Sequence, residues 1–106
     1  MLIRPVLAAV LLALPALAAP ALALDDPAAG KAIAMRWCAS CHLVEGGQAT
    51  APAAGVPSFA AIAAKPGQSA ERIAGAIVAP HPPMPDLQLS RQQIADLAAY
   101  ILSFKK

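Results

Sequence analysis

Two cysteines and a histidine lie within five residues of the chain, as Cys38, Cys41 and His42. The spacing C-x-x-C-H is that of a c-type haem attachment site. Cysteines three residues apart share one face of a helical turn, so both thiols can add to the two vinyl groups on one edge of a porphyrin. The imidazole that follows can then reach the iron. The motif predicts a covalently held haem, with Cys38 and Cys41 as thioether links and His42 as the proximal iron ligand.

A pair of cysteines at this spacing has other uses. It can form a disulfide, a thioredoxin-like redox pair or half of a zinc site. A thioredoxin-like pair needs strands around it, and the chain has no convincing strand alternation. A zinc site needs a fourth ligand, and His81 is the only other histidine. The imidazole directly after Cys41 favours haem over all three.

Met84 is the predicted distal iron ligand. It lies among the prolines of residues 80–85, which predict a stiff extended segment that presents the sulfur in one direction. A thioether is a soft, neutral ligand, and His/Met ligation raises the iron potential. Met35 competes, but it precedes the motif and lies on the wrong side of the ring. His81 is the other alternative, since it would give a bis-histidine haem of lower potential.

The second ring nitrogen of His42 is expected to donate a hydrogen bond to a backbone carbonyl, because such a bond selects the tautomer that can bind iron. The loop predicted over residues 43–57 contains several glycines and prolines, which interrupt regular structure. Two of its carbonyl groups, those of Pro52 and Pro57, are candidates for the acceptor. The sequence leaves the choice between them open.

The first 23 residues have the features of an export signal. Arg4 supplies a positive start, residues 6–14 form an apolar run, and Ala21-Leu22-Ala23 fits the small-x-small cleavage rule. Two prolines interrupt the stretch, which suits a cleaved signal better than a membrane helix. An uncleaved anchor is the alternative. We expect a signal peptide over residues 1–23 and one monohaem domain over residues 24–106, exported to a periplasm.

The composition of the mature chain limits its class. Its seven basic and six acidic side chains leave a net charge near zero and form no basic stripe, so no nucleic-acid partner is expected. A domain of about 80 residues has a thin core and often needs a covalent or metal staple. Large apolar side chains are scarce and alanine is common. A porphyrin would supply the missing apolar bulk.

Capping residues and apolar spacing predict two helices in the first half of the mature chain. The first begins at Asp26 and Pro27 and runs into the haem motif. The second is short and extends from Ser58 to Lys65. The side chains expected to face inward are those of Gly30, Ile33, Ala34 and Trp37 in the first helix, and of Phe59 and Ile62 in the second.

Two further helices are predicted in the second half. One begins at Ser69 and ends before Pro80, and the other begins at a capping box formed by Ser90 and Gln93. Tyr100 and Phe104 are expected to flank the buried stripe of the last helix. The predicted apolar faces consist of Ile73, Ile77 and Val78 in the third helix, and of Ile94, Leu97, Ala98, Ile101 and Leu102 in the fourth.

Over residues 25–106 the chain resembles the small bacterial class I c-type cytochromes. Three segments carry the resemblance: the haem motif over residues 38–42, the segment His81-Pro82-Pro83-Met84-Pro85 followed by Leu87 and Leu89, and the closing helix over residues 93–101. The resemblance implies an all-α, cytochrome c-like fold of about four short helices around one covalently attached haem c. It also implies one-electron transfer.

In that family the first and last helices cross at close range. Gly30, eight residues before Cys38, matches the glycine that permits the approach, and Leu97 and Tyr100 match the pair of side chains that packs there. Many relatives have an aromatic residue where this chain has Ala34, which implies a looser crossing. The chain has no clear equivalent of the tryptophan or arginine that binds a haem propionate in many of them.

The predicted function is that of a periplasmic one-electron carrier, whose His/Met-ligated haem cycles between Fe(III) and Fe(II). Six-coordinate iron leaves no position for a substrate, and no carboxylate pair or Ser/His/Asp set indicates hydrolysis, so we do not expect an enzyme. One alternative is the haem subunit of a periplasmic dehydrogenase or oxidase complex. Another is a five-coordinate haem that senses gas ligands or turns over peroxide.

The expected partners are redox proteins, one donor and one acceptor, with no stable membrane insertion once the signal is removed. The chain is expected to act as a monomer or as a subunit of a redox complex. Charged residues are few, and the segments expected to border the haem are rich in alanine, proline and glycine. We therefore predict docking through a small apolar patch that includes Ala39, Pro82 and Pro83, with weak dependence on salt.

Overall fold

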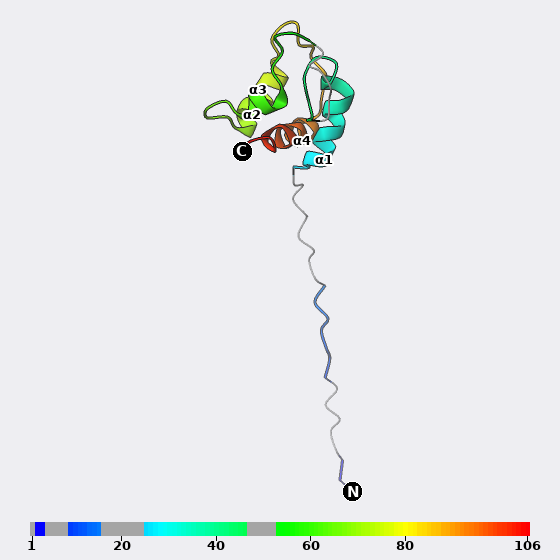
Figure 1. The fold of residues 1–106 in the computed structure, drawn as a ribbon. Coiled ribbons are helices and arrows are strands. Elements are labelled where there is room, and N and C mark those ends of the chain that lie inside the picture. Colours follow the sequence, from blue (N-terminus) through cyan, green and yellow to red (C-terminus); the bar gives the residue numbers. More distant parts are fainter. Residues whose placement is uncertain (1, 4–8, 16–24, 47–52) are drawn as a thin grey trace.

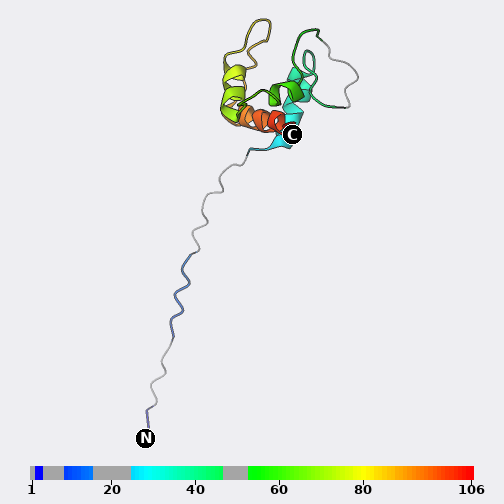
Figure 2. The same ribbon diagram turned by 60° about the vertical axis from the view of Figure 1, so that its left-hand side comes forward.

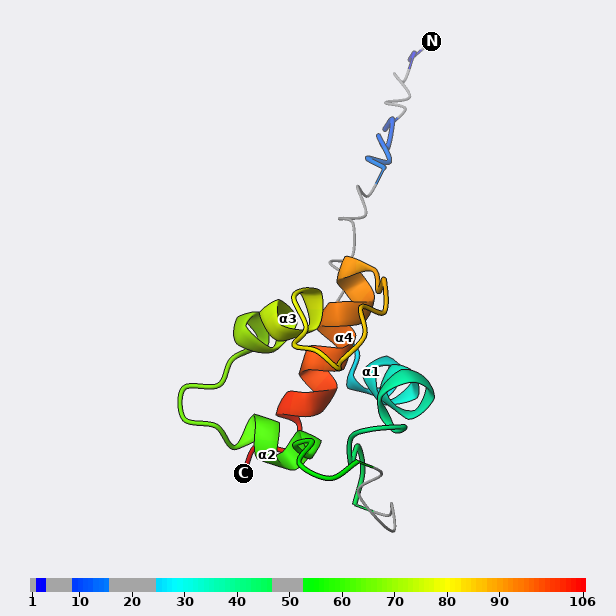
Figure 3. The ribbon, with the colours of Figure 1, turned by 90° about the horizontal axis from the view of Figure 1, so that it is seen from above.

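The computed structural model describes residues 2–3, 9–15, 25–46 and 53–106. In chain order its helices are α1 (Pro27–Ile33), the π-helical turn η1 (Ala34–Cys38), α2 (Phe59–Ala63), α3 (Ala70–Val78) and α4 (Arg91–Leu102). The α4 helix lies in the middle, with α1 crossing it on one side and α2 and α3 on the other (Figures 1 and 3). The described residues contain no strand, and the predicted all-α fold class is confirmed.

A side-chain cap precedes each of the four α-helices, as predicted. Asp26 accepts from the amide of Ala28 at 2.9 Å, and Ser58 and Ser69 accept from amides three residues further on. Ser90 and Gln93 form the full capping box at the start of α4. These bonds satisfy amide groups that have no partner within the helix. The α2 helix ends at Ala63, two residues before the end predicted from the sequence.

The crossing of α1 and α4 is close because Gly30 has no side chain. A Cβ atom at this position would lie 2.0 Å from the carbonyl oxygen of Asp96 and 2.9 Å from the Cβ of Tyr100. One turn further along, Ala34 is completely buried, so the small side chain lets the two backbones stay together. Leu97 and Tyr100 are both buried at this crossing, as the resemblance implied, whereas a crossing looser than that of relatives stays a prediction.

The η1 turn explains one wrong expectation. The amide of Ala39 donates to the carbonyl of Ala34 at 3.0 Å, five residues back, which makes the turn wider than that of an α-helix. Cys38 rather than Trp37 then follows Ala34 into the interior. Cys38 is 8% exposed, whereas Trp37 is 47% exposed and stacks under the guanidinium of Arg36.

The core forms where α4 meets the other helices. Leu97, Ala98 and Ile101 are buried as predicted, whereas Ile94 and Leu102 are half-buried. Tyr100 is buried instead of flanking the stripe. Val78 is exposed, contrary to prediction, because α3 ends at this residue and the chain leaves the helix there.

Asp96 is a buried acid that the sequence analysis did not single out. Its Oδ1 accepts from the backbone amide of Asp26 at 2.9 Å and from the side chain of Gln92 at 2.8 Å. The carboxylate thus links the start of α1 to the middle of α4, next to the Gly30 contact. A buried acid with two donors of this kind helps to hold the crossing in one arrangement.

Most of the expected signal peptide, including its cleavage site, lies outside the described residues. Residues 2–3 and 9–15 have no regular secondary structure, and residues 9–15 lie apart from the helices (Figure 2). No helix in the described part of the chain is long and apolar enough to cross a membrane. The division into residues 1–23 and 24–106 stays a prediction.

Candidate haem-binding site

The C-x-x-C-H motif folds into a single closed turn at the end of η1. The carbonyl of Cys38 accepts two hydrogen bonds, from the amide of Cys41 at 3.1 Å and from the amide of His42 at 2.9 Å. Both cysteines are free thiols, with Cys38 buried and Cys41 exposed. The turn brings together three of the four predicted haem-binding residues within a few residues of backbone.

The imidazole of His42 is oriented by a hydrogen bond to the loop. Its Nδ1 lies 2.6 Å from the carbonyl oxygen of Pro57, and since a carbonyl only accepts, Nδ1 must carry the proton. This tautomer leaves the Nε2 lone pair to serve as a metal ligand. Pro57 is therefore the acceptor of the two that the sequence suggested, whereas Pro52 lies outside the described residues. The ring of Phe59 supports the imidazole at 5.6 Å between centroids.

Burial raises the pKa of the Cys38 thiol to about 11, because the apolar surroundings disfavour the charged thiolate. The same surroundings suit a neutral sulfur. A thioether carries no charge and has no proton to lose, so the position of Cys38 is well matched to a sulfur bonded covalently to an apolar group.

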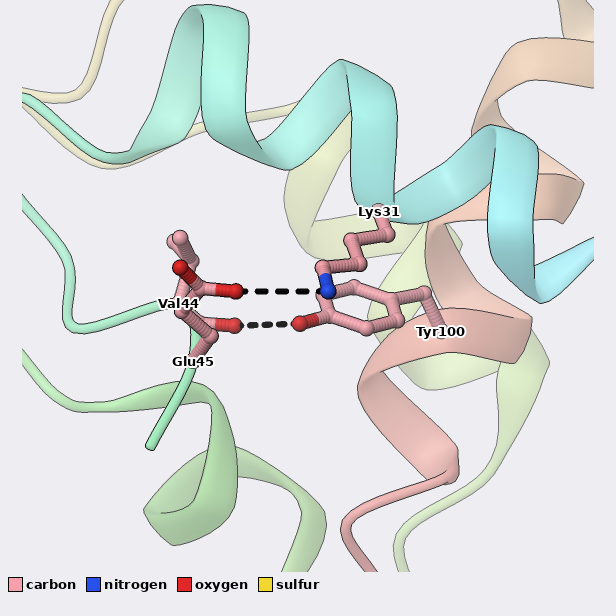
Figure 4. Close-up of polar contacts among 4 residues, drawn as sticks. All are labelled: Lys31, Val44, Glu45 and Tyr100. Atoms are coloured by element: carbon pink, nitrogen blue, oxygen red, sulfur yellow. Dashed lines mark hydrogen bonds and ion pairs between the residues drawn. The ribbon is translucent and has the colours of Figure 1, made fainter. Parts of the chain in front are cut away.

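The residues that follow His42 are attached to the helix crossing. The hydroxyl of Tyr100 donates to the carbonyl of Val44 at 2.6 Å, and Lys31 forms an ion pair with Glu45 at 3.3 Å (Figure 4). Val44 is completely buried. Sequence reasoning missed both links, although a tyrosine expected at a helix crossing is a signal, because a buried tyrosine usually finds a partner for its hydroxyl.

Met84 lies in a separate loop, between α3 and α4. This loop and the segment after η1 extend from the same end of the helical body (Figures 1 and 2). The predicted extended conformation is wrong: the amide of Met84 donates to the carbonyl of His81 at 2.7 Å, which closes a turn. Prolines 82, 83 and 85 have no amide proton, so Met84 supplies the donor of this turn.

The alternative ligands are in less favourable surroundings. Met84 is half-buried, whereas His81 is exposed and Met35 is 44% exposed on η1. No three His, Cys, Asp or Glu side chains gather as a metal site within the described residues. The chemistry of the donor set, two thiols and an oriented imidazole with a thioether in the loop between α3 and α4, matches a c-type haem.

Comparison with known proteins identifies the family of the chain. The family model described as cytochrome c matches residues 27–105, so the chain belongs to the cytochrome c family. Over 80 residues it is 50% identical to cytochrome c-552 of Bradyrhizobium diazoefficiens, an alignment that covers 76% of each chain. No solved structure matches the chain.

The class predicted from the sequence, a small bacterial class I c-type cytochrome, is thereby confirmed. Proteins of this family bind haem c covalently and transfer electrons, and this chain is an electron carrier of that kind. The individual haem-binding residues, the number of haems, the location and the partners are proposals, which follow.

Proposed function

We propose that this cytochrome is a periplasmic carrier of one electron with a single haem. Cys38 and Cys41 would form the thioether links to the haem, and His42 and Met84 would bind its iron. The proposal rests above all on the 2.6 Å hydrogen bond from Nδ1 of His42 to the carbonyl of Pro57, directly after the Cys38 turn. That bond orients an imidazole next to the two thiols in the manner that iron ligation requires.

The haem supplies the redox chemistry, since its iron takes up and releases one electron between Fe(III) and Fe(II). The chain supplies the ligands and the surroundings. His42 would bind the iron through Nε2, while its Nδ1 keeps its proton and donates a hydrogen bond to the carbonyl of Pro57. That hydrogen bond makes the imidazole a better electron donor. Met84 supplies a neutral sulfur, which favours the ferrous state and raises the potential. If His42 and Met84 both bound the iron, the site would have no free position for a substrate.

Export to the periplasm is supported by the sequence of residues 1–23, which has a positive start, an apolar run and a small-x-small cleavage site. We further propose one redox protein as electron donor and one as electron acceptor.

A mass measurement tests the cleavage of the signal and the number of haems. It uses denatured protein from a host with a cytochrome c maturation system. The expected mass is that of a chain beginning at Leu24 plus one haem, and a mass containing residues 1–23 or a second haem would contradict the proposal.

Optical spectra of the holoprotein test the ligands. Met84→Ala is expected to abolish the far-red band of the ferric protein, which reports sulfur bound to iron, and to open the ferrous iron to CO. Met35→Ala is the matched control, since it removes a thioether from the exposed η1 surface and should leave the band unchanged. His81→Ala should also leave it unchanged. Loss of the band in either control, or its survival in Met84→Ala, would overturn the assignment of Met84.

A further inference from the structure

Four consecutive residues, 42–45, are each held by a different part of the fold. We refer to them as the proximal segment. The four contacts are His42 Nδ1 to Pro57 O at 2.6 Å, Leu43 O to Phe59 N at 3.0 Å, Val44 O to Tyr100 Oη at 2.6 Å, and Glu45 Oε2 to Lys31 Nζ at 3.3 Å.

The Tyr100 contact is the buried one. Val44 has no exposed surface and Tyr100 is 8% exposed, so this hydrogen bond forms away from water, where its geometry is well defined. The Tyr100 ring also contacts Phe59 at 6.1 Å between centroids, and Phe59 contacts the ring of His42 at 5.6 Å. Tyr100 thus reaches the proximal imidazole both through the backbone of Val44 and through Phe59.

The Lys31 contact reaches the same segment from α1. The Lys31 and Glu45 side chains are 53% and 32% exposed, so the ion pair contributes little to stability. The pair still sets where Glu45 lies relative to α1, because Lys31 is adjacent to Gly30 at the helix crossing. Figure 4 shows the Tyr100 hydroxyl pointing at the backbone carbonyl of Val44 and the Lys31 ammonium pointing at the side-chain carboxylate of the next residue, Glu45.

We propose that Tyr100 and Lys31 are positioning residues for the proximal iron ligand. Through Val44 and Glu45 they hold His42 at the distance from Pro57 that gives the 2.6 Å hydrogen bond. The strength of that bond controls how much electron density the imidazole donates to the iron, and hence the reduction potential. This inference rests on the proposed function, in which His42 binds the iron.

Tyr100→Phe in the holoprotein tests the proposal, because it removes one hydroxyl and keeps the ring. The proximal segment should relax, the bond between His42 and Pro57 should lengthen, and the imidazole should donate less to the iron. The expected results are a higher reduction potential and a change in the hyperfine-shifted NMR resonances of the His42 ring. Both are measured on the same sample as its urea unfolding curve.

Ser90→Ala is the matched control. It removes one hydrogen bond from the capping box of α4 and carries no change of charge, and none of the four contacts of the proximal segment involves Ser90. It should lower the urea midpoint and leave both the potential and the His42 resonances at their wild-type values. A merely structural role for Tyr100 predicts the same behaviour in Tyr100→Phe, and that result would overturn the proposal.

A charge-neutral pair of double variants keeps the proposal testable if Tyr100→Phe fails to fold. Lys31→Gln with Glu45→Gln removes the ion pair at unchanged net charge, and should raise the potential less than Tyr100→Phe does. Lys31→Glu with Glu45→Lys restores the pair and should return the potential toward the wild-type value. Equal potentials in both double variants would contradict the role of Lys31.

The same NMR spectra separate this inference from the proposed function. If His42 is not an iron ligand, its ring resonances lack the large contact shifts of a ring bound to ferric iron in the wild-type protein, and the ligand assignment fails. If they are shifted in the wild type but identical in Tyr100→Phe, the ligand assignment stands and the positioning role fails.

Discussion

The proximal and distal halves of the site are built in different ways. The proximal segment, residues 42–45, is held by partners up to 56 residues away, on one loop and three helices. The distal segment, residues 80–89, makes hydrogen bonds only within itself among the described residues. Those bonds join Met84 to His81 and Gln88 to Asp86. The fold therefore positions the imidazole through tertiary contacts and the thioether through local turns.

This difference implies unequal stability. Segments with few tertiary contacts open at a lower free energy than the core elements to which they are attached. The proximal segment should therefore persist for as long as the α1–α4 crossing does, whereas the distal segment should open before the protein unfolds.

Gly30→Ala should cause the largest loss of stability, because it disrupts the α1–α4 crossing to which the proximal segment is attached. The new Cβ would lie 2.0 Å from the carbonyl oxygen of Asp96, so the backbones of α1 and α4 must separate. We expect a loss of about 3 kcal/mol in the free energy of unfolding, at the upper end of overpacking effects. Guanidinium denaturation followed by circular dichroism measures it.

Gly75→Ala is the control for that change. Gly75 lies within α3, and a Cβ there would meet nothing within 4 Å. The substitution should raise the free energy of unfolding by about 0.5–1 kcal/mol, since alanine is a better helix former than glycine. Equal losses in the two variants would show that the helix crossing has no special role.

The distal segment should open first in denaturant. As guanidinium rises, the ferric far-red band of sulfur ligation should disappear at a lower concentration than the helical circular dichroism signal. A separation of a few kcal/mol between the two events is expected for a segment that lacks tertiary hydrogen bonds. If both signals were lost in one coincident transition, the distal segment would be as well anchored as the proximal one, and the comparison would fail.

Tyr100 should titrate at unusually high pH. Burial raises the pKa of its phenol, the Glu45 carboxylate raises it further, and the Lys31 ammonium lowers it in part. Because the pKa in the folded state lies above the unfolded value of about 10, the neutral phenol stabilises the fold fully below pH 10. That contribution is lost as the pH rises through the folded-state pKa.

Ultraviolet absorbance of the phenolate measures this pKa without ambiguity, because Tyr100 is the only tyrosine in the chain. The titration midpoint should exceed that of the unfolded protein, and the signal should be absent from Tyr100→Phe. A midpoint equal to the unfolded value would mean that the hydroxyl is not held by Val44 in solution.

The smallest expected effect is that of salt concentration on the rate of electron exchange with the partner. The proposed docking patch combines Ala39, which is half-buried, with Pro82 and Pro83, which are exposed and uncharged. Since exposed charges are screened by salt and uncharged contacts are not, the rate should change little with ionic strength. Stopped-flow kinetics at several salt concentrations measures it, and a steep fall would show that charged residues guide docking.

Several features were predictable because they depend on neighbours in the sequence. Asp26, Ser58, Ser69 and Ser90 cap helices by bonding to amides two or three residues further on, so a short window identifies each helix start. The haem motif has the same local character. Its closing bonds join Cys38 to residues three and four positions ahead.

The errors arose where the local period changed or a helix ended. Because the η1 turn is wider than an α-helical turn, Cys38 lies in the core where Trp37 was expected. No residue type in that stretch predicts a π-helix. Val78 satisfies the periodicity of α3 but is its last residue. For residues 80–85 the prolines predicted an extended segment, whereas the chain turns there through the amide donor that Met84 provides.

By itself the sequence determined the haem motif, the helix starts and the resemblance to a family, since each follows from residue types at short, regular spacings. Only the tertiary structure decided that Pro57 accepts from His42, that Tyr100 reaches Val44, and that Asp96 holds the start of α1. These partners are 15, 56 and 70 residues apart. Such pairs are selected by the closure of long loops and the packing of helices, which no local pattern encodes.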